Sequence, residues 1–156
     1  MKFTRITFFL LLFLGSVFLI HSHIFGFEEW TPQRVATLFE ADLGGASLLV
    51  EVAGTRESLI KGLSGRESIG SDGLLMVFAT EGKHGIWMKD MNFAIDILWL
   101  DGYGRVVFIE EDVSPDTFPD VFRPDVESRF VLEVDAGRVE RENWRVGSVL
   151  SIGDPF

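Results

Sequence analysis

The stretch Gly85–Ile109, GIWMKDMNFAIDILWLDGYGRVVFI, holds the clearest secondary-structure pattern in the sequence. Apolar and β-branched residues over Asp96–Leu100 and Arg105–Glu110 predict two strands. Asp101-Gly102 stands between them, and an Asp-Gly pair readily adopts the positive φ angles of a tight hairpin turn. The stretch therefore predicts an antiparallel hairpin around which the other elements are arranged.

Two charged residues stand in this apolar stretch. Period-two alternation places Trp87 and Lys89 on the same strand face, and it places Asp96 on the face of Leu98, opposite Ile97. An unpaired buried charge is very unfavourable. Lys89 and Asp96 are therefore expected to pair with each other or with nearby charges, or to line a cavity that water or a ligand enters. The remaining alternative is that they mark strand ends in solvent.

The sequence before this stretch predicts a second hairpin. β-Branched and aromatic residues alternate over Val35–Phe39, and a turn at Asp42–Gly45 leads into the apolar run Ser47–Ala53. The alternative is a helix over Thr31–Gly45, with Thr31 as its N-cap. The alternation favours the hairpin.

Short elements separated by turns make up the remainder of the chain. They are predicted as a helix over Thr55–Leu63, a strand over Gly73–Phe78, an exposed loop over Asp112–Asp125, a strand over Arg129–Val134, a helix over Ala136–Asn143 and a strand over Ser148–Ile152. Many short strands with two small helices predict an α+β fold with a small antiparallel, barrel-like sheet.

The first 27 residues differ from the others in composition. Lys2 and Arg5 precede the apolar run Ile6–Ile20, and this segment has no acidic residue, as in an export signal or signal anchor. We expect residues 1–27 to be an uncleaved anchor in the cytoplasmic membrane with its N-terminus inside. Residues 28–34 would then be a tether, and residues 35–156 a single domain outside the cytoplasm. The alternative is a cleaved signal and a secreted domain.

The charge of the chain excludes some partners. All 24 acidic residues follow residue 27, as do 12 of the 14 basic ones, so that part has a formal charge of −12. Such a charge argues against nucleic acid and against a second docking patch on anionic lipid. The chain has no cysteine, so the exported domain has no disulfide framework and depends on its core for stability.

The usual catalytic and metal-binding signatures are missing from the sequence. There is no phosphate-binding glycine loop, no His-Glu-x-x-His and no thiol nucleophile. His84 is the only histidine beyond the tether, so it is a secondary candidate for acid–base chemistry. The pair His21 and His23 beside Glu28-Glu29 is better explained as the boundary of the anchor than as a zinc site. We expect no metal and no cofactor.

Four segments resemble the prokaryotic domain-of-unknown-function family 192. They are VEVAGTRES with GLSGR (Val50–Ser58 and Gly62–Arg66), GLLMVF (Gly73–Phe78), IWMKDMNFAIDILWLD (Ile86–Asp101), and FVLEVDAG with WRVGSVLSI (Phe130–Gly137 and Trp144–Ile152). The resemblance implies a small barrel-like α+β domain, often behind an export signal, with no settled activity. It also implies a functional role for its motif positions, which are Arg66, Trp87, Met88, Lys89 and Asp96.

Three functions follow from these observations. The first is a membrane-anchored binding or accessory domain that holds a small polar or anionic ligand in a cleft of Arg66, Trp87, Lys89 and Asp96, since cationic side chains make strong charge-assisted bonds. The second is a structural or interaction domain in which these charges form an ion-pair network that fixes strand register. The third is an envelope hydrolase or lyase with Asp96 as base and Lys89 or Arg66 as electrostatic stabiliser. No protein partner is identified, and the sequence favours a protein that is not an enzyme.

Overall fold

The computed structural model describes residues 37–153 of the 156-residue chain. The predicted anchor or signal at residues 1–27 and the tether at residues 28–34 lie outside the described residues. Within residues 37–153, no helix is both long enough and apolar enough to cross a membrane.

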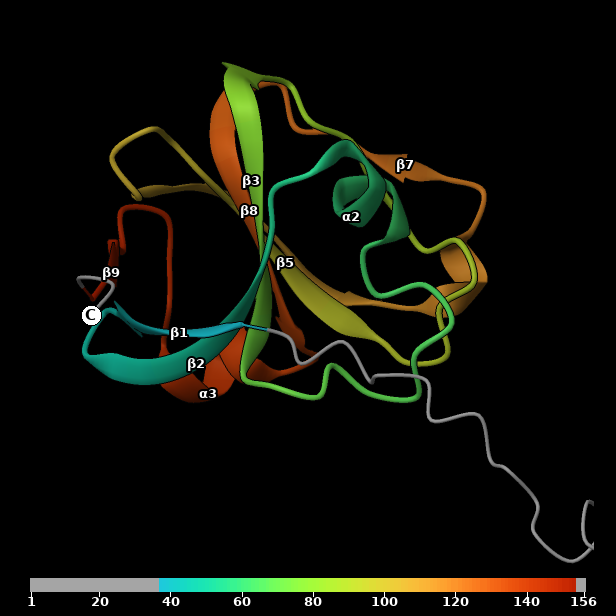
Figure 1. The fold of residues 1–156 in the computed structure, drawn as a ribbon, viewed down its shortest axis with the longest axis horizontal. Coiled ribbons are helices and arrows are strands. Elements are labelled where there is room, and N and C mark those ends of the chain that lie inside the picture. The colour runs from blue at the N-terminus through green and yellow to red at the C-terminus, as the bar shows by residue number, and fades with distance from the viewer. Residues whose placement is uncertain (1–36, 154–156) are drawn as a thin grey trace, which may run out of the picture. The chain divides into compact units, whose positions relative to one another are not determined.

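Strands are the main regular secondary structure of the described residues (Figure 1). The elements in chain order are β1 (Leu38–Leu43), β2 (Ala46–Ala53), α2 (Arg56–Lys61), β3 (Gly73–Gly82), β4 (Ile86–Trp87), β5 (Ile95–Leu100), β6 (Val106–Val113), the 3-10 helix η1 (Pro115–Thr117), β7 (Val121–Phe122), β8 (Ser128–Asp135), α3 (Arg138–Glu142) and β9 (Leu150–Ile152).

Seven of the strands form one sheet in the order β6-β5-β8-β3-β2-β1-β9, and β4 pairs separately with β7. The prediction of an antiparallel sheet is corrected at one pair, because β2 and β3 run parallel. The physical reason is the connection between them: α2 and the following loop carry the chain back along the sheet, as parallel neighbours require. The other pairs within the sheet are antiparallel.

The two hairpins predicted from the sequence are confirmed, but the first strand is Leu38–Leu43, later in the chain than the predicted Val35–Phe39. β1 pairs with β2 through the turn at Gly44-Gly45, and β5 pairs with β6. The predicted helix after Thr55 is confirmed as α2, with the Thr55 side chain accepting a hydrogen bond from the Ser58 N–H. The predicted loop Asp112–Asp125 is less irregular than expected, because it contains η1 and β7.

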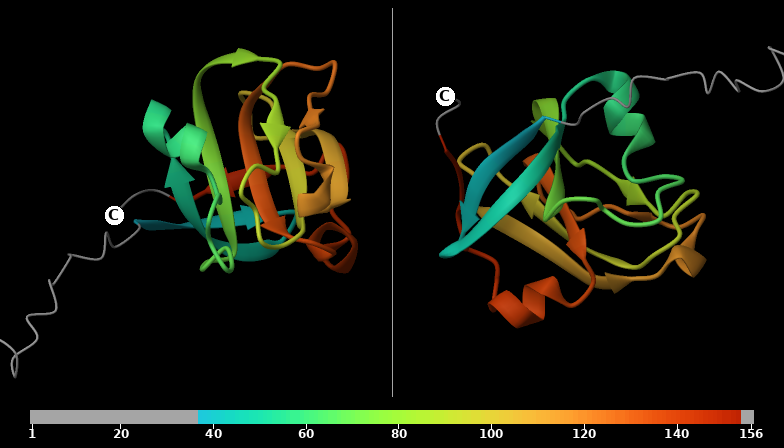
Figure 2. Two further views of the ribbon diagram at one scale, coloured as in Figure 1. Left: turned by 90° about the vertical axis from the view of Figure 1, so that its right-hand side faces the viewer. Right: turned by 60° about the horizontal axis from the view of Figure 1, so that its bottom comes forward.

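The sheet is strongly curved into a half-barrel, with α2 and α3 on opposite sides of it (Figure 2). The chain at its two outer strands, β6 and β9, meets at one end. There the Leu150 N–H donates to the Gly104 carbonyl and the Val106 N–H donates to the Ser148 carbonyl, both at 2.8 Å. A Cβ on Gly104 would collide with the Leu150 carbonyl oxygen, and its φ is +76°. Glycine is therefore required where the edges meet.

Strand β5, which lies between β6 and β8, is buried along its whole length. Leu98 and Leu100 contribute to the apolar cluster on one face, and Ile97 and Trp99 to the cluster on the other. The predicted alternation in this strand is therefore confirmed. Both faces of the sheet are covered here, so a polar side chain on β5 needs a partner inside the protein.

Asp96 lies on the Leu98 face of β5 and is 0% exposed. Its Oδ1 accepts from the Asp112 N–H, and its Oδ2 accepts from the Val139 N–H, both at 2.9 Å. Asp112 has φ +52° at a register irregularity of the β5–β6 pair, and Val139 is in the first turn of α3. The Asp96 carboxylate thus accepts from one backbone N–H at the β5–β6 irregularity and from one in the first turn of α3. No side chain of the α3 N-cap residue makes a capping hydrogen bond.

We predict that Asp96→Asn lowers the free energy of unfolding by about 2 kcal/mol or more. The amide keeps one acceptor oxygen, and its NH2 group faces one of the two backbone donors. Urea denaturation of Asp96→Asn at pH 7 measures the change, and Asp135→Asn at the exposed end of β8 is the control. A loss no larger than that of the control would contradict the assigned role.

Candidate functional site

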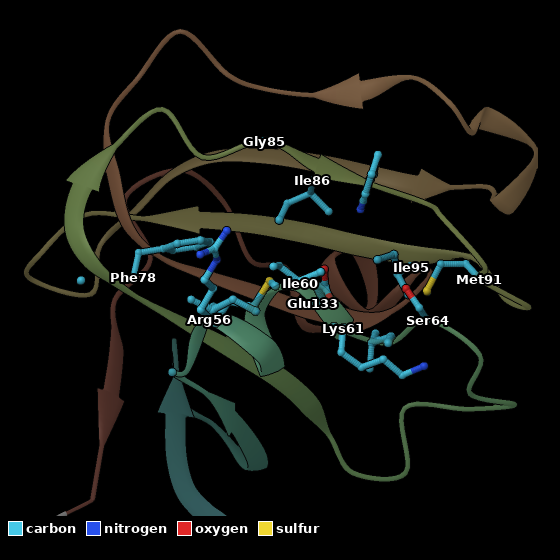
Figure 3. Close-up of a pocket in the computed structure, with 17 residues that line it drawn as sticks. Arg56, Ile60, Lys61, Ser64, Phe78, Gly85, Ile86, Met91, Ile95 and Glu133 are labelled. Atoms are coloured by element: carbon cyan, nitrogen blue, oxygen red, sulfur yellow. The ribbon is translucent and has the colours of Figure 1, made fainter.

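A cavity of about 480 Å³ lies between α2, β3 and β4 (Figure 3). Most of its wall is apolar, with side chains that include Leu59, Ile60, Met76, Phe78, Met91 and Ile95. Trp87 of β4 also lines it and is 47% exposed, so the indole is within reach of solvent. The cavity has the size and the apolar lining of a small-molecule site.

Glu133 of β8 is the only carboxylate among the lining residues. Its register partners are Leu74 on β3 and Ile97 on β5, so its side chain lies on the Ile97 face of the sheet. Figure 3 shows Glu133 near the middle of the lining side chains, with Phe78 to one side and Met91 to the other. Glu133 is 5% exposed, and its Oε2 is buried without a hydrogen-bond partner.

Burial raises the pKa of Glu133 from its ordinary value of 4.5 to about 7, and the positive charge of Arg66 opposes this rise only in part. The cause is the loss of hydration, which disfavours the charged form of the carboxyl. A carboxyl that changes charge near neutral pH, inside an apolar cavity, is a feature of functional sites.

The cations near Glu133 form no ion pair with it in the described part of the chain. Arg56 and Lys61 are exposed residues of α2 at the cavity wall, and Figure 3 shows the Lys61 amino group pointing outward. Arg66, in the loop after α2, makes a bidentate contact with Glu51 of β2, with distances of 2.7 and 2.9 Å. Arg66 also donates to the Ile69 carbonyl at 3.1 Å.

The Arg66–Glu51 contact shifts the pKa of both partners in the direction expected for an ion pair. Hydrogen bonding to the guanidinium lowers the pKa of Glu51, and hydrogen bonding to the carboxylate raises the pKa of Arg66. Two of the donors of Arg66 are thus already used by a carboxylate of the protein itself. Arg66 does not line the cavity.

The three predicted residues of the Trp-Met-Lys motif lie in different environments in the structure. Met88 is buried in the core at 1% exposure, whereas Trp87 and Lys89 are exposed, as the predicted alternation requires. The Lys89 Nζ lies 5.7 Å from the centre of the Trp87 ring, within the range of a cation–π contact. Of these three residues only Trp87 lines the cavity.

The predicted cleft of Arg66, Trp87, Lys89 and Asp96 is therefore corrected. Strand alternation puts Asp96 on the opposite face of the sheet from Glu133, where backbone donors occupy both of its oxygens. No ion pair joins Lys89 to Asp96 among residues 37–153, so the predicted network between them is not formed.

His84, the secondary candidate, stacks on the Phe78 ring at a centroid distance of 3.6 Å. Its Nε2 lies 3.1 Å from the Thr80 carbonyl oxygen. It is not a lining residue of the cavity. In the described ranges, no group of three or more His, Asp or Glu residues is placed to hold a metal ion.

A second hollow of about 470 Å³ lies beside β1, β2 and β9, with Glu40, Asp42 and Asp72 in its wall. Asp72 is held by Arg138 at 2.9 Å and by the Leu49 N–H at 2.9 Å. The first cavity is the stronger candidate, because it contains a buried polar atom whose bonding is incomplete.

Glu133 was the residue that the sequence interpretation missed. It stands in Phe130–Gly137, FVLEVDAG, where the acid interrupts a run of apolar residues in a predicted strand. The same argument that selected Lys89 and Asp96 would have selected it. Alternation along the strand puts Glu133 and Val134 on opposite faces. The strand register pairs Val134 with Asp96, and only this register shows that Glu133 and Asp96 lie on different faces of the sheet.

The sequence pattern of the family DUF192, described as Uncharacterized ACR, matches residues 39–152. A comparison with curated proteins finds no match. Among solved structures, a candidate transcription regulator from Sinorhizobium meliloti 1021 superposes with a TM-score of 0.70 at 25% sequence identity, covering 75% of this chain and 95% of that one. A protein of unknown function from Novosphingobium aromaticivorans superposes with a TM-score of 0.70 at 21% identity, covering 77% and 89%. Both solved chains consist almost entirely of the matched fold, so this fold forms without a further domain.

We predict that Glu133 makes the domain less stable as the pH rises from about 4.5 to 7. Below pH 4.5 the carboxyl is protonated in both the folded and the unfolded protein. Between pH 4.5 and 7 it ionises only in the unfolded protein, so the free energy of unfolding falls. Above pH 7 it is ionised in both, and the loss of unfolding free energy stays at about 3 kcal/mol. Glu133→Gln should remove this loss, because glutamine does not ionise. The free energy of unfolding of the variant, relative to that of the parent protein, should therefore rise between pH 4.5 and 8. Denaturant unfolding across this range tests the prediction, with Glu111→Gln, at an exposed position of β6, as the control. A stability difference that does not vary with pH would refute the prediction.

Proposed function

The chain belongs to the uncharacterized DUF192 family, and we propose that it is a binding domain that holds a small, largely apolar molecule in the cavity between α2, β3 and β4. The observation that carries this proposal is an apolar cavity of about 480 Å³ with a single buried carboxylate in its wall. Ligand sites of small molecules commonly have this size, with mostly apolar walls and a few polar groups that orient the ligand.

The ligand class differs from the one expected from the sequence. A polar or anionic ligand was expected because Arg66 and Lys89 were placed in the cleft, and neither lines the cavity. The apolar walls instead favour a molecule whose binding is driven mainly by removing apolar surface from water.

Catalysis is the second candidate, and one observation favours it: a carboxyl with a pKa of about 7 is suited to general acid–base chemistry. Asp96, the base expected from the sequence, is buried behind the sheet with both oxygens bonded. Ser64 lines the cavity, but its hydroxyl donates to the Lys89 carbonyl at 2.8 Å rather than to a base. The arrangement supports binding better than turnover.

The proposal includes the anchor predicted at residues 1–27, which would hold the domain at the outer face of the cytoplasmic membrane. Its support is the basic start and the apolar run of that segment. Mass spectrometry of the protein from the membrane fraction should find Met1–Phe27 retained. Recovery of a soluble form that starts near His23 or Phe27 would show a cleaved signal instead.

We predict that the domain Ala36–Phe156 binds the neutral apolar dye N-phenyl-1-naphthylamine, whose fluorescence rises in an apolar environment. Met91→Trp should lower the affinity about tenfold or more, because the larger ring occupies part of the cavity. Fluorescence titration gives the dissociation constant of each protein.

The matched control is Met91→Leu, which changes the shape of the side chain at nearly constant volume and should bind the dye almost as well as the parent domain. Unfolding curves of the two variants check that both are folded. If the parent domain and Met91→Trp bind the dye equally, the dye is not in this cavity and the proposed function fails.

A further inference from the structure

We propose that the molecule bound in this cavity carries a protonated amine on an apolar body, and that the ionised Glu133 carboxylate binds the ammonium group. This inference rests on the proposed function and specifies the chemical class of its ligand. It concerns the one polar side chain that the cavity wall holds deeply buried.

The bonding state of Glu133 is the first argument. Its Oε2 is buried and has no hydrogen-bond partner, and the residue is 5% exposed on the cavity wall. An ionised carboxylate can only accept hydrogen bonds, so a ligand group that completes its bonding must be a donor. The strongest such bonds come from charged N–H donors, which also offset the cost of burying the negative charge.

The cations of the protein are the second argument, because none of them forms an ion pair with Glu133 in the part of the chain that the structure describes, and the charge of Arg66 offsets its burial only in part. Arg66 is bound in bidentate fashion to Glu51, at 2.7 and 2.9 Å. Arg56 and Lys61 are exposed on α2, and the Lys61 amino group points away from Glu133 in Figure 3. A positive charge next to Glu133 would therefore come from the ligand.

The wall around Glu133 fits the remainder of such a molecule. Phe78, Met76 and Ile95 supply apolar surface, and the half-exposed Trp87 adds an aromatic ring to the wall. The formal charge of −12 on the chain after residue 27 adds a general attraction for cations over the whole surface.

Binding of an ammonium group should depend on the ionisation of Glu133. The charged side chains around it are Arg56 and Lys61, which line the cavity from α2, and Arg66 in the following loop, whose charge acts on Glu133 although it is paired with Glu51 of β2. β3, β4 and β5 contribute no titratable side chain to the cavity wall. Glu133 is the one carboxylate of the wall, so its ionisation is expected to set the pH dependence of amine binding.

The test uses 2-phenylethylamine and its neutral analogue 2-phenylethanol with the domain Ala36–Phe156, by isothermal titration calorimetry. The amine stays protonated from pH 5.5 to 8.5, as a lysine side chain does. Because the carboxyl of Glu133 ionises near pH 7, affinity for the amine should rise about 30-fold between pH 5.5 and 8.5. Affinity for the alcohol should change less than about twofold across this range.

Two variants separate the role of Glu133 from a general effect of charge. At pH 8.5, Glu133→Gln should lower the affinity for the amine about 30-fold and the affinity for the alcohol much less. Glu111→Gln removes one exposed acid that does not line the cavity and should behave like the parent domain.

Equal affinity for the amine and the alcohol at pH 8.5, or an unchanged amine affinity in Glu133→Gln, would overturn this inference. Binding of N-phenyl-1-naphthylamine in that case would leave the proposed function standing. If neither the two phenylethyl compounds nor the dye binds, the proposed function and this inference both fail.

Discussion

Side-chain alternation along the paired strands β5 and β8 is the constraint on which the rest of the structure depends. Both faces of the sheet are covered where Asp96 and Glu133 lie, so each of these two acids is buried on one face or the other. Because Asp96 pairs in register with Val134, and Ile97 with Glu133, the two acids point to opposite faces. A shift of one residue in this register would exchange the environments of both.

The two carboxylates show how burial leads to different roles. Asp96 has both oxygens bonded to backbone N–H groups, so it connects the β5–β6 irregularity to the start of α3 and contributes to the fold. Glu133 has a buried oxygen without a partner and lies in the wall of a cavity. A buried carboxylate whose bonding is complete stabilises the structure, whereas one whose bonding is incomplete destabilises it and is available to a ligand.

Much of the fold could be predicted from the sequence, because local signals specified it. Asp101-Gly102 marked the hairpin turn, Thr55 marked the helix start, and alternation in β5 identified its two faces. The candidate site could not be predicted equally well. That Asp96 meets α3, and that Arg66 meets Glu51 instead of a ligand, depends on strand order and on contacts between residues far apart in the chain.

The most direct measurement is the titration of the Glu133 side-chain carboxyl by carbon-13 NMR, with the signal assigned by its loss in Glu133→Gln. We expect the carboxyl to titrate with a pKa of about 7 in the ligand-free domain, because burial disfavours its charge. Saturation with 2-phenylethylamine should lower this pKa, since the ammonium group stabilises the ionised form. A carboxyl that titrates near 4.5 and does not respond to the amine would contradict the role assigned to Glu133.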